Sequence, residues 1–356
     1  MGRAEGIGSV AARFCSVCKT RFLILTAATL VALCSVFANA QQTVVLVGAG
    51  STVPLPLYKR WSLDYNQHNP RARLEYLALG TSEGINEVST GKTDFGAGEA
   101  PLGSREMAEK GMIQIPIALI GIVPIYNLPG IHGELHFSGE VLAGIFLGEI
   151  KSWNAAQITK LNPGIDLPSL PIKVFYRPAG KGSNYVLTEF LSKTNAGFRA
   201  RVGVSASPHW PVGEAAERSS DIADKVSGEA GAIGYVELQY AAERKIPFGA
   251  VQNPAGHFVR ATSESLAAAC KAVEAPRWEN LGASLTNAGG ADSYPITSFT
   301  WLYARANPAE PDRTLALAEM LNWMIGEGQQ SVAQEGYARL PQPLADAAKG
   351  KIQSLR

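Results

Sequence analysis

Residues 43–54 read TVVLVGAGSTVP, and this stretch decides the fold class of the chain. The β-branched run at 43–47 predicts a buried strand, and the glycines that follow it predict a tight turn. Ser51 and Thr52 then lead to prolines at 54 and 56, which is the pattern of a helix start. We therefore expect a strand, a turn and a helix in direct succession.

The same succession recurs twice, each time as a strand, a glycine-containing turn and a helix. The first repeat covers residues 73–89, with GTS at 80–82 and a helix expected from residue 83. The second covers residues 173–192, with GKGS at 180–183 and a helix expected from residue 185. Strands that alternate with helices indicate α/β lobes with largely parallel sheets.

Further strands are expected later in the chain, at residues 231–236 and 294–301, and a short one leads to Glu99. Residues 113–126 are almost wholly apolar but contain two prolines, so we expect two strands there and a crossing between lobes. A helical region is expected to close the chain from residue 315.

The chain is long enough for two domains of ordinary size. It has 356 residues, of which 46% are apolar and 18% charged, with a formal net charge of +1. This balance argues against a disordered chain and gives no reason to expect nucleic acid as a partner. We expect residues 41–122 and 295–356 to form lobe 1, and residues 123–294 to form lobe 2.

The first forty residues have the order of a secretory signal peptide. Four basic residues precede the apolar run 23–37, and residues 38–40 (ANA) place small residues at the cleavage-determining positions. A membrane anchor is the alternative, but the apolar run is shorter than the ~20 residues of a spanning helix. We expect cleavage before Gln41, export to the periplasm, and a net charge of −2 in the mature chain.

Cys270 is the one cysteine expected in the mature chain. Cys15, Cys18 and Cys34 lie in the leader, and no second cysteine pair follows that would complete a metal or redox motif. A single cysteine cannot form an intramolecular disulfide, so the apolar core must hold the fold.

The three turns share one design that suits an anion. Residues 50–53, 80–82 and 180–183 each place glycine and hydroxyl side chains at an expected helix N-terminus. Free backbone N–H groups and the positive end of the helix dipole attract anions there. One such turn is more often an ordinary helix cap, but three in one chain indicate an oxyanion site.

Arg177 and Glu99 add two charged groups to this pattern. Arg177 precedes the third turn, and its planar guanidinium matches two oxygens of a tetrahedral anion, although a structural ion pair is the alternative. Glu99 repels a fully ionised anion but accepts a hydrogen bond from an anion that keeps a proton. Phosphate keeps a proton near neutral pH and sulfate does not, so Glu99 would favour phosphate.

Several motifs, in order along nearly all of the mature chain, resemble the periplasmic phosphate-binding protein of phosphate ABC transporters, the PstS family. They are GAGSTVP at 48–54, TDFGAGEAPL at 93–102, GAIGYVE at 231–237 and YPIT at 294–297, with Trp153 and LNPG at 161–164. The resemblance implies a type II periplasmic-binding-protein fold, with two α/β lobes joined by hinge strands that close over one phosphate. It further implies a monomer that delivers phosphate to a membrane permease, with no catalysis, no cofactor and no metal.

The resemblance also implies eight phosphate-binding positions, spread over the three turns and the end of one strand. They are Thr52, Val53, Thr81, Glu99, Arg177, Lys181, Gly182 and Ser183. Thr81 replaces a usual serine, and Glu99 stands where the family has a proton-accepting aspartate.

The chain departs from the family pattern at three positions of the site, and two of these departures change the charge. Glu99 is one methylene longer than aspartate, Ala179 replaces an aspartate that partners the arginine, and Lys181 replaces a serine. The site loses one negative charge, and it gains a positive charge unless Lys181 points to solvent. Such a pocket suits phosphate, a more highly charged anion or a phosphate ester. The family's glycine-rich stretch after Trp210 is also altered, to EAAER at 214–218.

A serine hydrolase is a rival hypothesis. Residues 80–84 (GTSEG) match the G-x-S-x-G nucleophile elbow between a strand and a helix, with Ser82 as the nucleophile. His209 or His257 would have to act as the base, but neither has a recognisable acid–histidine context.

Nucleotide hydrolysis and metal binding would rest on shorter patterns. Residues 180–183 lack the spacing of a P-loop, so nucleotide hydrolysis is not supported. His132 and His136 are four residues apart, but Gly133 between them predicts a loop and not a metal-binding helix. A secreted binding or adhesive protein that serves no transporter is the second hypothesis for the chain, because of the departures at Glu99, Ala179 and Lys181.

Overall fold

A computed structural model describes residues 43–273, 282–306 and 310–355. The predicted signal peptide at residues 1–40 lies outside these ranges. The strands are β1 (Val44–Gly50), β2 (Ala72–Ala78), β3 (Phe95–Gly98), β4 (Met112–Tyr126), β5 (His136–Phe137), β6 (Lys173–Tyr176), β7 (Glu214–Ala215), β8 (Ala232–Glu237), β9 (Ala250–Gln252), β10 (Phe258–Val259) and β11 (Thr297–Arg305). The helices are α2 (Leu55–His68), α3 (Thr81–Ser89), α4 (Ser104–Lys110), α5 (Gly139–Phe146), α6 (Ala156–Thr159), α7 (Gly182–Thr194), α8 (Ala196–Arg201), α9 (Ser219–Gly228), α10 (Leu238–Glu243), α11 (Ser263–Lys271), α12 (Pro311–Ile325), α13 (Gln329–Val332) and α14 (Gln342–Gln353).

Eight of the strands form one sheet, in the order β2-β1-β3-β11-β4-β8-β6-β7, and β10, β9 and β5 form a small second sheet. At one end of the large sheet β2, β1 and β3 are parallel, and at the other end β8, β6 and β7 are parallel. The α/β class is therefore as predicted. Between the parallel groups, β11 and β4 pair antiparallel with each other and with their neighbours, which the alternation of strands and helices did not predict.

β4 is one strand of fifteen residues, all buried, and not the two strands predicted for residues 113–126. The register between β4 and β11 shifts at Pro116, which pairs with Trp301 while the preceding residue of β11, Thr300, pairs with Ala118. Proline is tolerated at such an irregularity because it has no N–H to contribute to the ladder. The chain therefore crosses the centre of the sheet without a break.

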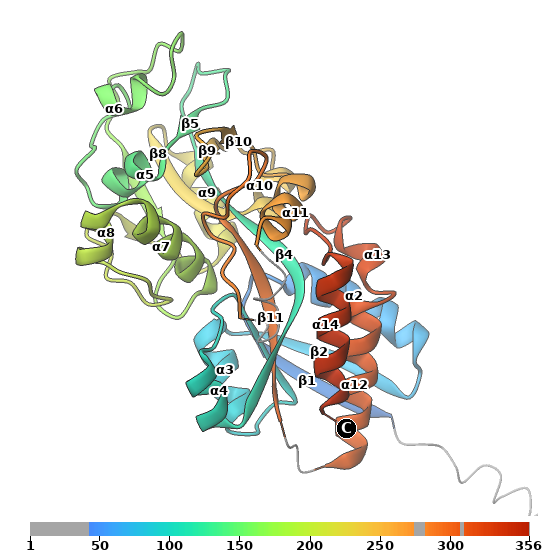
Figure 1. Ribbon diagram of the computed structural model, residues 1–356. Helices are drawn as coiled ribbons and strands as arrows, with labels where there is room; N and C mark the ends of the chain where they lie inside the picture. Colours follow the sequence, from blue (N-terminus) through green and yellow to red (C-terminus); the bar gives the residue numbers. More distant parts are fainter. Residues whose placement is uncertain (1–42, 274–281, 307–309, 356) are drawn as a thin grey trace, which may run out of the picture. The chain divides into compact units, whose positions relative to one another are not determined.

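β4 also links the two parallel groups of strands (Figure 1). It pairs with β11 through Gly121 and with β8 from Ile122 onward. β4 is therefore buried along its whole length and connects the two groups directly.

The first helix shows why these segments fold as they do. Pro54 and Pro56 stand at the start of α2, where a missing N–H carries no penalty. Its buried side chains are Leu57, Tyr58, Trp61 and Tyr65, which share one face of a helix. The indole of Trp61 donates a hydrogen bond of 2.8 Å to the carbonyl of Gly328, so this face packs against the C-terminal helical region.

Two helices begin earlier than predicted. α3 begins at Thr81 and not at residue 83, and α7 begins at Gly182 and not at residue 185. The hydroxyl-rich turns are therefore the first turns of these helices, where backbone N–H groups have no partner within the helix.

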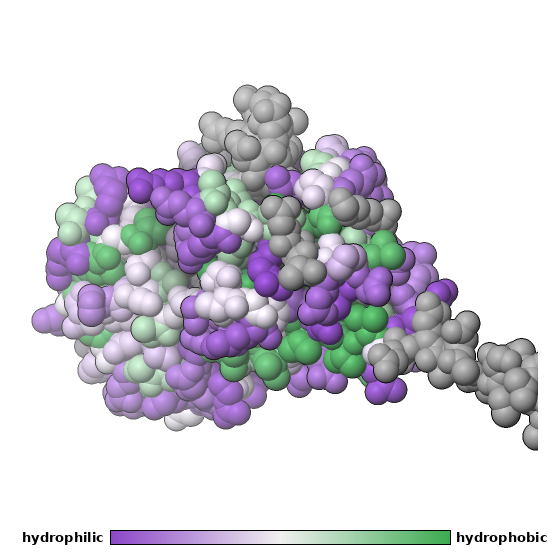
Figure 2. Space-filling view, turned by 90° about the horizontal axis from the view of Figure 1, so that it is seen from below, coloured by the Kyte–Doolittle hydropathy of each residue, from purple (hydrophilic) through white to green (hydrophobic). Residues whose placement is uncertain are grey.

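The surface facing the viewer in Figure 2 is mainly hydrophilic, with hydrophobic groups interspersed. Among the described residues, no helix combines the length and the apolar character needed to cross a membrane.

Candidate functional site

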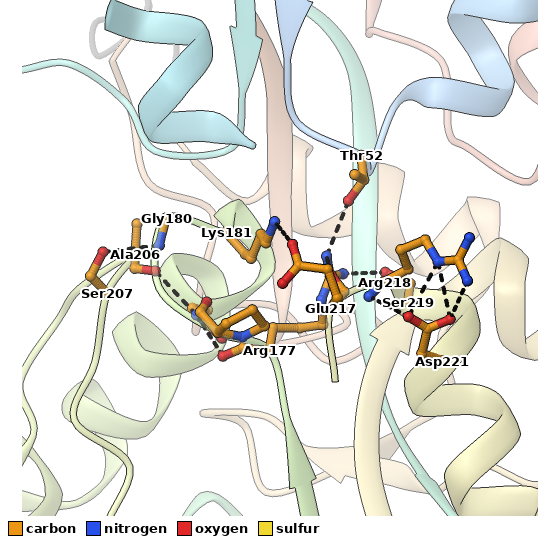
Figure 3. Close-up of polar contacts among 12 residues, drawn as sticks. Thr52, Arg177, Gly180, Lys181, Ala206, Ser207, Glu217, Arg218, Ser219 and Asp221 are labelled. Carbon is orange, nitrogen blue, oxygen red and sulfur yellow. Dashed lines mark hydrogen bonds and ion pairs between the residues drawn. The ribbon is translucent and has the colours of Figure 1, made fainter. Parts of the chain in front are cut away.

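The predicted site residues lie where strands of both parallel groups end. Thr52 follows β1, Thr81 follows β2 and Glu99 follows β3, while Arg177 follows β6 in the other group. In open α/β sheets the carboxyl ends of the strands are where ligands bind. A hydrogen bond of 3.3 Å from Arg177 Nη2 to Thr52 Oγ1 joins the two groups (Figure 3).

Glu99 lies completely buried at the centre of this region. Its Oε2 accepts hydrogen bonds from Ser51 Oγ at 2.6 Å and from Thr81 Oγ1 at 3.1 Å. Its Oε1 is buried without a hydrogen-bond partner. A buried carboxyl oxygen without a partner is costly, so Oε1 is the oxygen of Glu99 that a ligand can meet. The hydroxyl of Thr300 is a further protein group that acts on this carboxyl.

Burial raises the pKa of Glu99 from its ordinary value of 4.5 to about 8, although the hydroxyl of Ser51 opposes this shift. The charge of Glu237, a second buried carboxylate at the end of β8, adds to the rise. The Glu99 carboxyl therefore keeps its own proton at neutral pH. This protonation state was not predicted from the sequence, because it depends on burial.

Gly182 allows the Glu99 side chain to reach the start of α7. A β-carbon at Gly182 would lie 1.8 Å from Glu99 Oε2 and 2.6 Å from Thr81 Oγ1. Only glycine leaves room for this approach. Ser183, the next residue, has a buried Oγ without a hydrogen-bond partner. The first turn of α7 thus brings helix N–H groups and a free hydroxyl next to Glu99.

Arg177 is the buried cation of the site, with 1% of its surface exposed. Besides Thr52, its guanidinium donates to Ser219 Oγ at 2.5 Å and to the carbonyl of Glu217 at 2.7 Å (Figure 3). Its Nε is buried without a partner. Ala179, which replaces the expected acidic partner, is exposed, so neutral oxygens hold the guanidinium in its place.

A rigid scaffold positions the Arg177 loop. The backbone N–H of Arg177 donates to the Tyr235 hydroxyl at 3.0 Å, and that hydroxyl donates to Asn184. The Asn184 amide donates back to the carbonyls of Arg177 and Pro178, at 3.1 and 2.7 Å. Gly180 has a φ of 81°, which favours glycine, and its N–H donates to Ser207 Oγ at 2.9 Å.

Lys181 points into the site and not to solvent, since 9% of its side chain is exposed. Its Nζ lies 2.5 Å from Oε1 of Glu217, whose side chain is 67% exposed (Figure 3). The sequence left open whether the Lys181 side chain points into the site or to solvent, and in the structure it points inward. The added positive charge is therefore already paired with a carboxylate.

In the first of the three turns, residues 50–53, the predicted backbone donor is already hydrogen-bonded within the protein. The N–H of Val53 donates to Ser51 Oγ at 3.0 Å, so this predicted donor has a partner within the protein. The carbonyl of Val53 accepts from Tyr337 at 2.7 Å and from Gln239 at 3.2 Å. Val53 is thus fixed at the site by its backbone.

The site also contains residues that were not among the predicted eight. They are Ser51, Glu217, Ser219 and Glu237. Glu237 is the last residue of a strand, and Glu99 directly follows a strand. This shared position at a strand end is a feature of the sequence that could have identified Glu237 as a site residue. Glu217 and Ser219 carried no such signal, because their proximity to Arg177 comes from tertiary folding over forty residues.

The hydrolase hypothesis finds no support in the geometry. Ser82 is exposed at the start of α3, and its N–H donates to the carbonyl of Gly180 at 3.3 Å. His209 and His257 are also exposed, and no hydrogen bond joins either of them to Ser82 among the described residues. The triad geometry is therefore absent from this part of the chain.

The histidine pair does not form a metal site either. His136 lies in β5 and stacks on Phe258, with ring centroids 4.3 Å apart. Within the described ranges, no group of three or more His, Cys, Asp or Glu residues could hold a metal ion. Cys270 is free and buried, and burial raises its pKa to about 12.

Comparison with known proteins agrees with this architecture. The sequence pattern of the PBP superfamily domain matches residues 38–327. The chain is 35% identical over 306 residues to the "Phosphate-binding protein PstS" of Xylella fastidiosa (strain 9a5c), covering 85% of this chain and 84% of the relative. It is 34% identical to the protein of that name from Pasteurella multocida (strain Pm70), covering 86% and 90% of the two chains.

Solved structures resemble the fold at lower sequence identity. A high-affinity periplasmic phosphate-binding protein, PfluDING, solved with phosphate at pH 8.5, has a TM-score of 0.69 at 18% identity, covering 86% of this chain and 93% of its own. A putative phosphate ABC transporter substrate-binding protein with bound phosphate, from Clostridium perfringens, has a TM-score of 0.62 at 19% identity, covering 83% and 100%. The fold is that of the type II periplasmic binding proteins.

Proposed function

Because this chain belongs to the PstS family of phosphate-binding proteins, within the PBP superfamily, we propose that it binds inorganic phosphate at the site around Glu99 and Arg177 and delivers it to an ABC transporter. One observation carries the proposal. Three buried polar atoms of complementary kinds, Arg177 Nε, Ser183 Oγ and Glu99 Oε1, lack hydrogen-bond partners, and all three belong to residues that follow the carboxyl ends of strands. A polar ligand bound there would supply the partners that these atoms need.

The donors of the site suit a tetrahedral anion. Arg177 supplies a buried guanidinium, and the first turn of α7 supplies the Ser183 hydroxyl and the N–H groups of a helix N-terminus. Thr52 and Thr81 add hydroxyls from the other parallel group, and Lys181 adds an ammonium. An anion held by these groups would be largely removed from water, which strengthens each charge-assisted hydrogen bond.

The ionisation state of Glu99 determines whether the site prefers a protonated or an unprotonated anion. When its carboxyl is ionised, Oε1 accepts a hydrogen bond from an anion that has a proton, such as phosphate. When the carboxyl is protonated, Oε1 donates a hydrogen bond to the anion, and sulfate can then bind as well as phosphate does. Since burial raises the pKa of Glu99 to about 8, discrimination against sulfate should strengthen as the pH rises through that value.

A second ligand class is favoured by Lys181. The ammonium is an extra cation relative to the family pattern, and it lies inside the site. A phosphate ester or a more highly charged oxyanion would use this charge as well as phosphate does. Binding without delivery to a transporter would leave the same site chemistry in place.

We infer that residues 41–122 with 295–356, and residues 123–294, move as two lobes about the site. In support, β4 changes its partner from β11 to β8 between Gly121 and Ile122, next to the inferred boundary. Ligand entry would break the hydrogen bond between Arg177 and Thr52, and closure around the anion would re-form it. The closed form would then be the one that a membrane permease recognises. We propose a monomer that reaches the periplasm by its cleaved leader, with no catalytic step.

Calorimetric titration of the mature chain, residues 41–356, tests the proposal. Inorganic phosphate, sulfate and a phosphate monoester would be titrated separately at pH 8.5. We expect one phosphate per chain and much weaker sulfate binding. Tighter binding of the ester than of phosphate would identify the second ligand class, and no uptake of any of the three would refute an oxyanion site.

A further inference from the structure

Lys181 and Glu217 form an ion pair of unequal partners inside the site. Lys181 Nζ lies 2.5 Å from Glu217 Oε1, but 9% of the lysine side chain is exposed against 67% of the glutamate. An ammonium that is so deeply buried needs an anion beside it, because an unpaired buried charge is costly. The exposed carboxylate has no such need, because water solvates it well.

Glu217 touches the second cation too. Its backbone carbonyl accepts a hydrogen bond of 2.7 Å from Arg177, while its side chain reaches Lys181 (Figure 3). The next two residues lead into α9, where Ser219 Oγ accepts a second hydrogen bond from Arg177, at 2.5 Å. The backbone of Glu217 is therefore anchored, whereas its carboxylate ends in a mostly exposed side chain that is free to rotate away.

We propose that Glu217 determines the anion affinity of the site by acting as a built-in competitor: its carboxylate occupies Lys181, and an arriving oxyanion displaces it. This inference rests on the proposed function. On binding, an oxygen of the anion replaces Glu217 Oε1 beside the ammonium, and Glu217 turns into solvent. No charge is left unpaired, because the buried lysine exchanges one anionic partner for another.

The competitor has two consequences for the ligand. Part of the attraction between Lys181 and the anion is offset by the loss of the Glu217 pair, so affinity is lower than the two cations alone would give. The displaced carboxylate also stays near the mouth of the site, where it repels anions. Glu217 therefore limits the gain that the extra lysine would otherwise bring.

The test is phosphate titration of the mature chain and of the E217Q variant, which keeps the shape of the side chain and removes its charge. Glu214, three residues earlier, provides a matched control, because its side chain is 72% exposed and it pairs with Lys225 at 3.3 Å. We expect E217Q to lower the Kd for phosphate by roughly three- to tenfold and E214Q to leave it within about twofold. E217A repeats the test without a side-chain amide.

A double-mutant cycle shows whether Glu217 acts through Lys181. The gain from E217Q should shrink to less than half on a logarithmic scale in a K181Q background, because there is no ammonium left to release. A gain of the same size in both backgrounds would mean a general charge effect and would overturn the inference. So would unchanged or weaker phosphate binding by E217Q.

Failure of the proposed function looks different from failure of this inference. If the parent chain binds phosphate and E217Q does not bind it more tightly, the inference alone is wrong. If the parent chain and every variant bind no phosphate, the proposed function is wrong and the inference falls with it.

Discussion

The Glu99 carboxyl group lies against Gly182 so closely that a β-carbon on the glycine would be 1.8 Å from Oε2. Glu99 follows β3 of one parallel group and Gly182 begins α7 after β6 of the other. The contact therefore joins the predicted proton-sensing group to the predicted anion-binding helix turn. A methyl group added at Gly182 would therefore push the Glu99 carboxyl away from the first turn of α7.

The first prediction is that G182A weakens phosphate binding by about 100-fold or more. The new methyl group must displace Glu99 Oε2 and Thr81 Oγ1, which takes both groups out of hydrogen-bonding position. Calorimetric titration measures the effect. G350A is the control, because an added β-carbon there meets no atom within 4 Å, and it should bind phosphate like the parent. Equal binding by G182A would show that the ligand does not depend on this contact.

The second prediction concerns the stability of the ligand-free protein. In the folded chain the pKa of Glu99 is about 8, above its ordinary value of 4.5, so between these values the folded state holds a proton that the unfolded state has lost. The contribution of Glu99 to the free energy of unfolding must therefore fall as the pH rises from about 4.5 to 8 and then level off. E99Q removes this penalty.

We expect thermal or urea unfolding to show that the stability of E99Q relative to the parent increases from pH 5 to pH 8, by on the order of a few kcal/mol. E109Q is a suitable control, because the Glu109 side chain is 59% exposed and pairs with Arg105 on the surface. A difference between E99Q and the parent that does not change with pH would mean that Glu99 ionises normally.

The third prediction is that selectivity depends on pH. The ratio of sulfate Kd to phosphate Kd should rise as the pH passes through about 8, because ionised Glu99 accepts a hydrogen bond from protonated phosphate but repels sulfate. In E99Q the ratio should be lower and nearly constant. Competition titrations at pH 6.5 and pH 9 would measure it, and a flat ratio for the parent would remove Glu99 from the selectivity mechanism.

The fourth prediction is that the guanidinium of Arg177, and not its charge alone, binds the ligand. R177K keeps the charge but cannot bond Ser219, Thr52 and the ligand together, so we expect phosphate binding to weaken about 10- to 100-fold, and further in R177A. T52A should have a smaller effect on phosphate binding. The hydrogen bond from Arg177 to Thr52 Oγ1 is long, at 3.3 Å, and therefore weak. Lysine serving as well as arginine would contradict this role.

Much of the local structure was predictable from the sequence, for a physical reason. Residues 43–54 and 173–183 carry β-branched runs, glycines and hydroxyls in an order that few other local structures accept, and the structure has a strand and a helix start at each. Predicted and observed helix starts differ by two or three residues, because the boundary depends on which N–H group finds a partner.

The central strand and the charge pairing were not predictable in the same way. The prolines at 116 and 124 suggest a break in β4, but a register shift against β11 absorbs Pro116. Nothing near Lys181 in the sequence shows that Glu217 is its partner, because the pair forms between segments 36 residues apart. The protonation of Glu99 depends likewise on burial by residues from several strands.

A crystal structure of the mature protein with phosphate bound at pH 8.5 would test the central claim most directly. We predict one phosphate within hydrogen-bonding distance of Arg177 Nε, Ser183 Oγ and Glu99 Oε1, three buried atoms that lack partners in the ligand-free protein. Phosphate bound elsewhere, with these three atoms still unpartnered, would contradict the account.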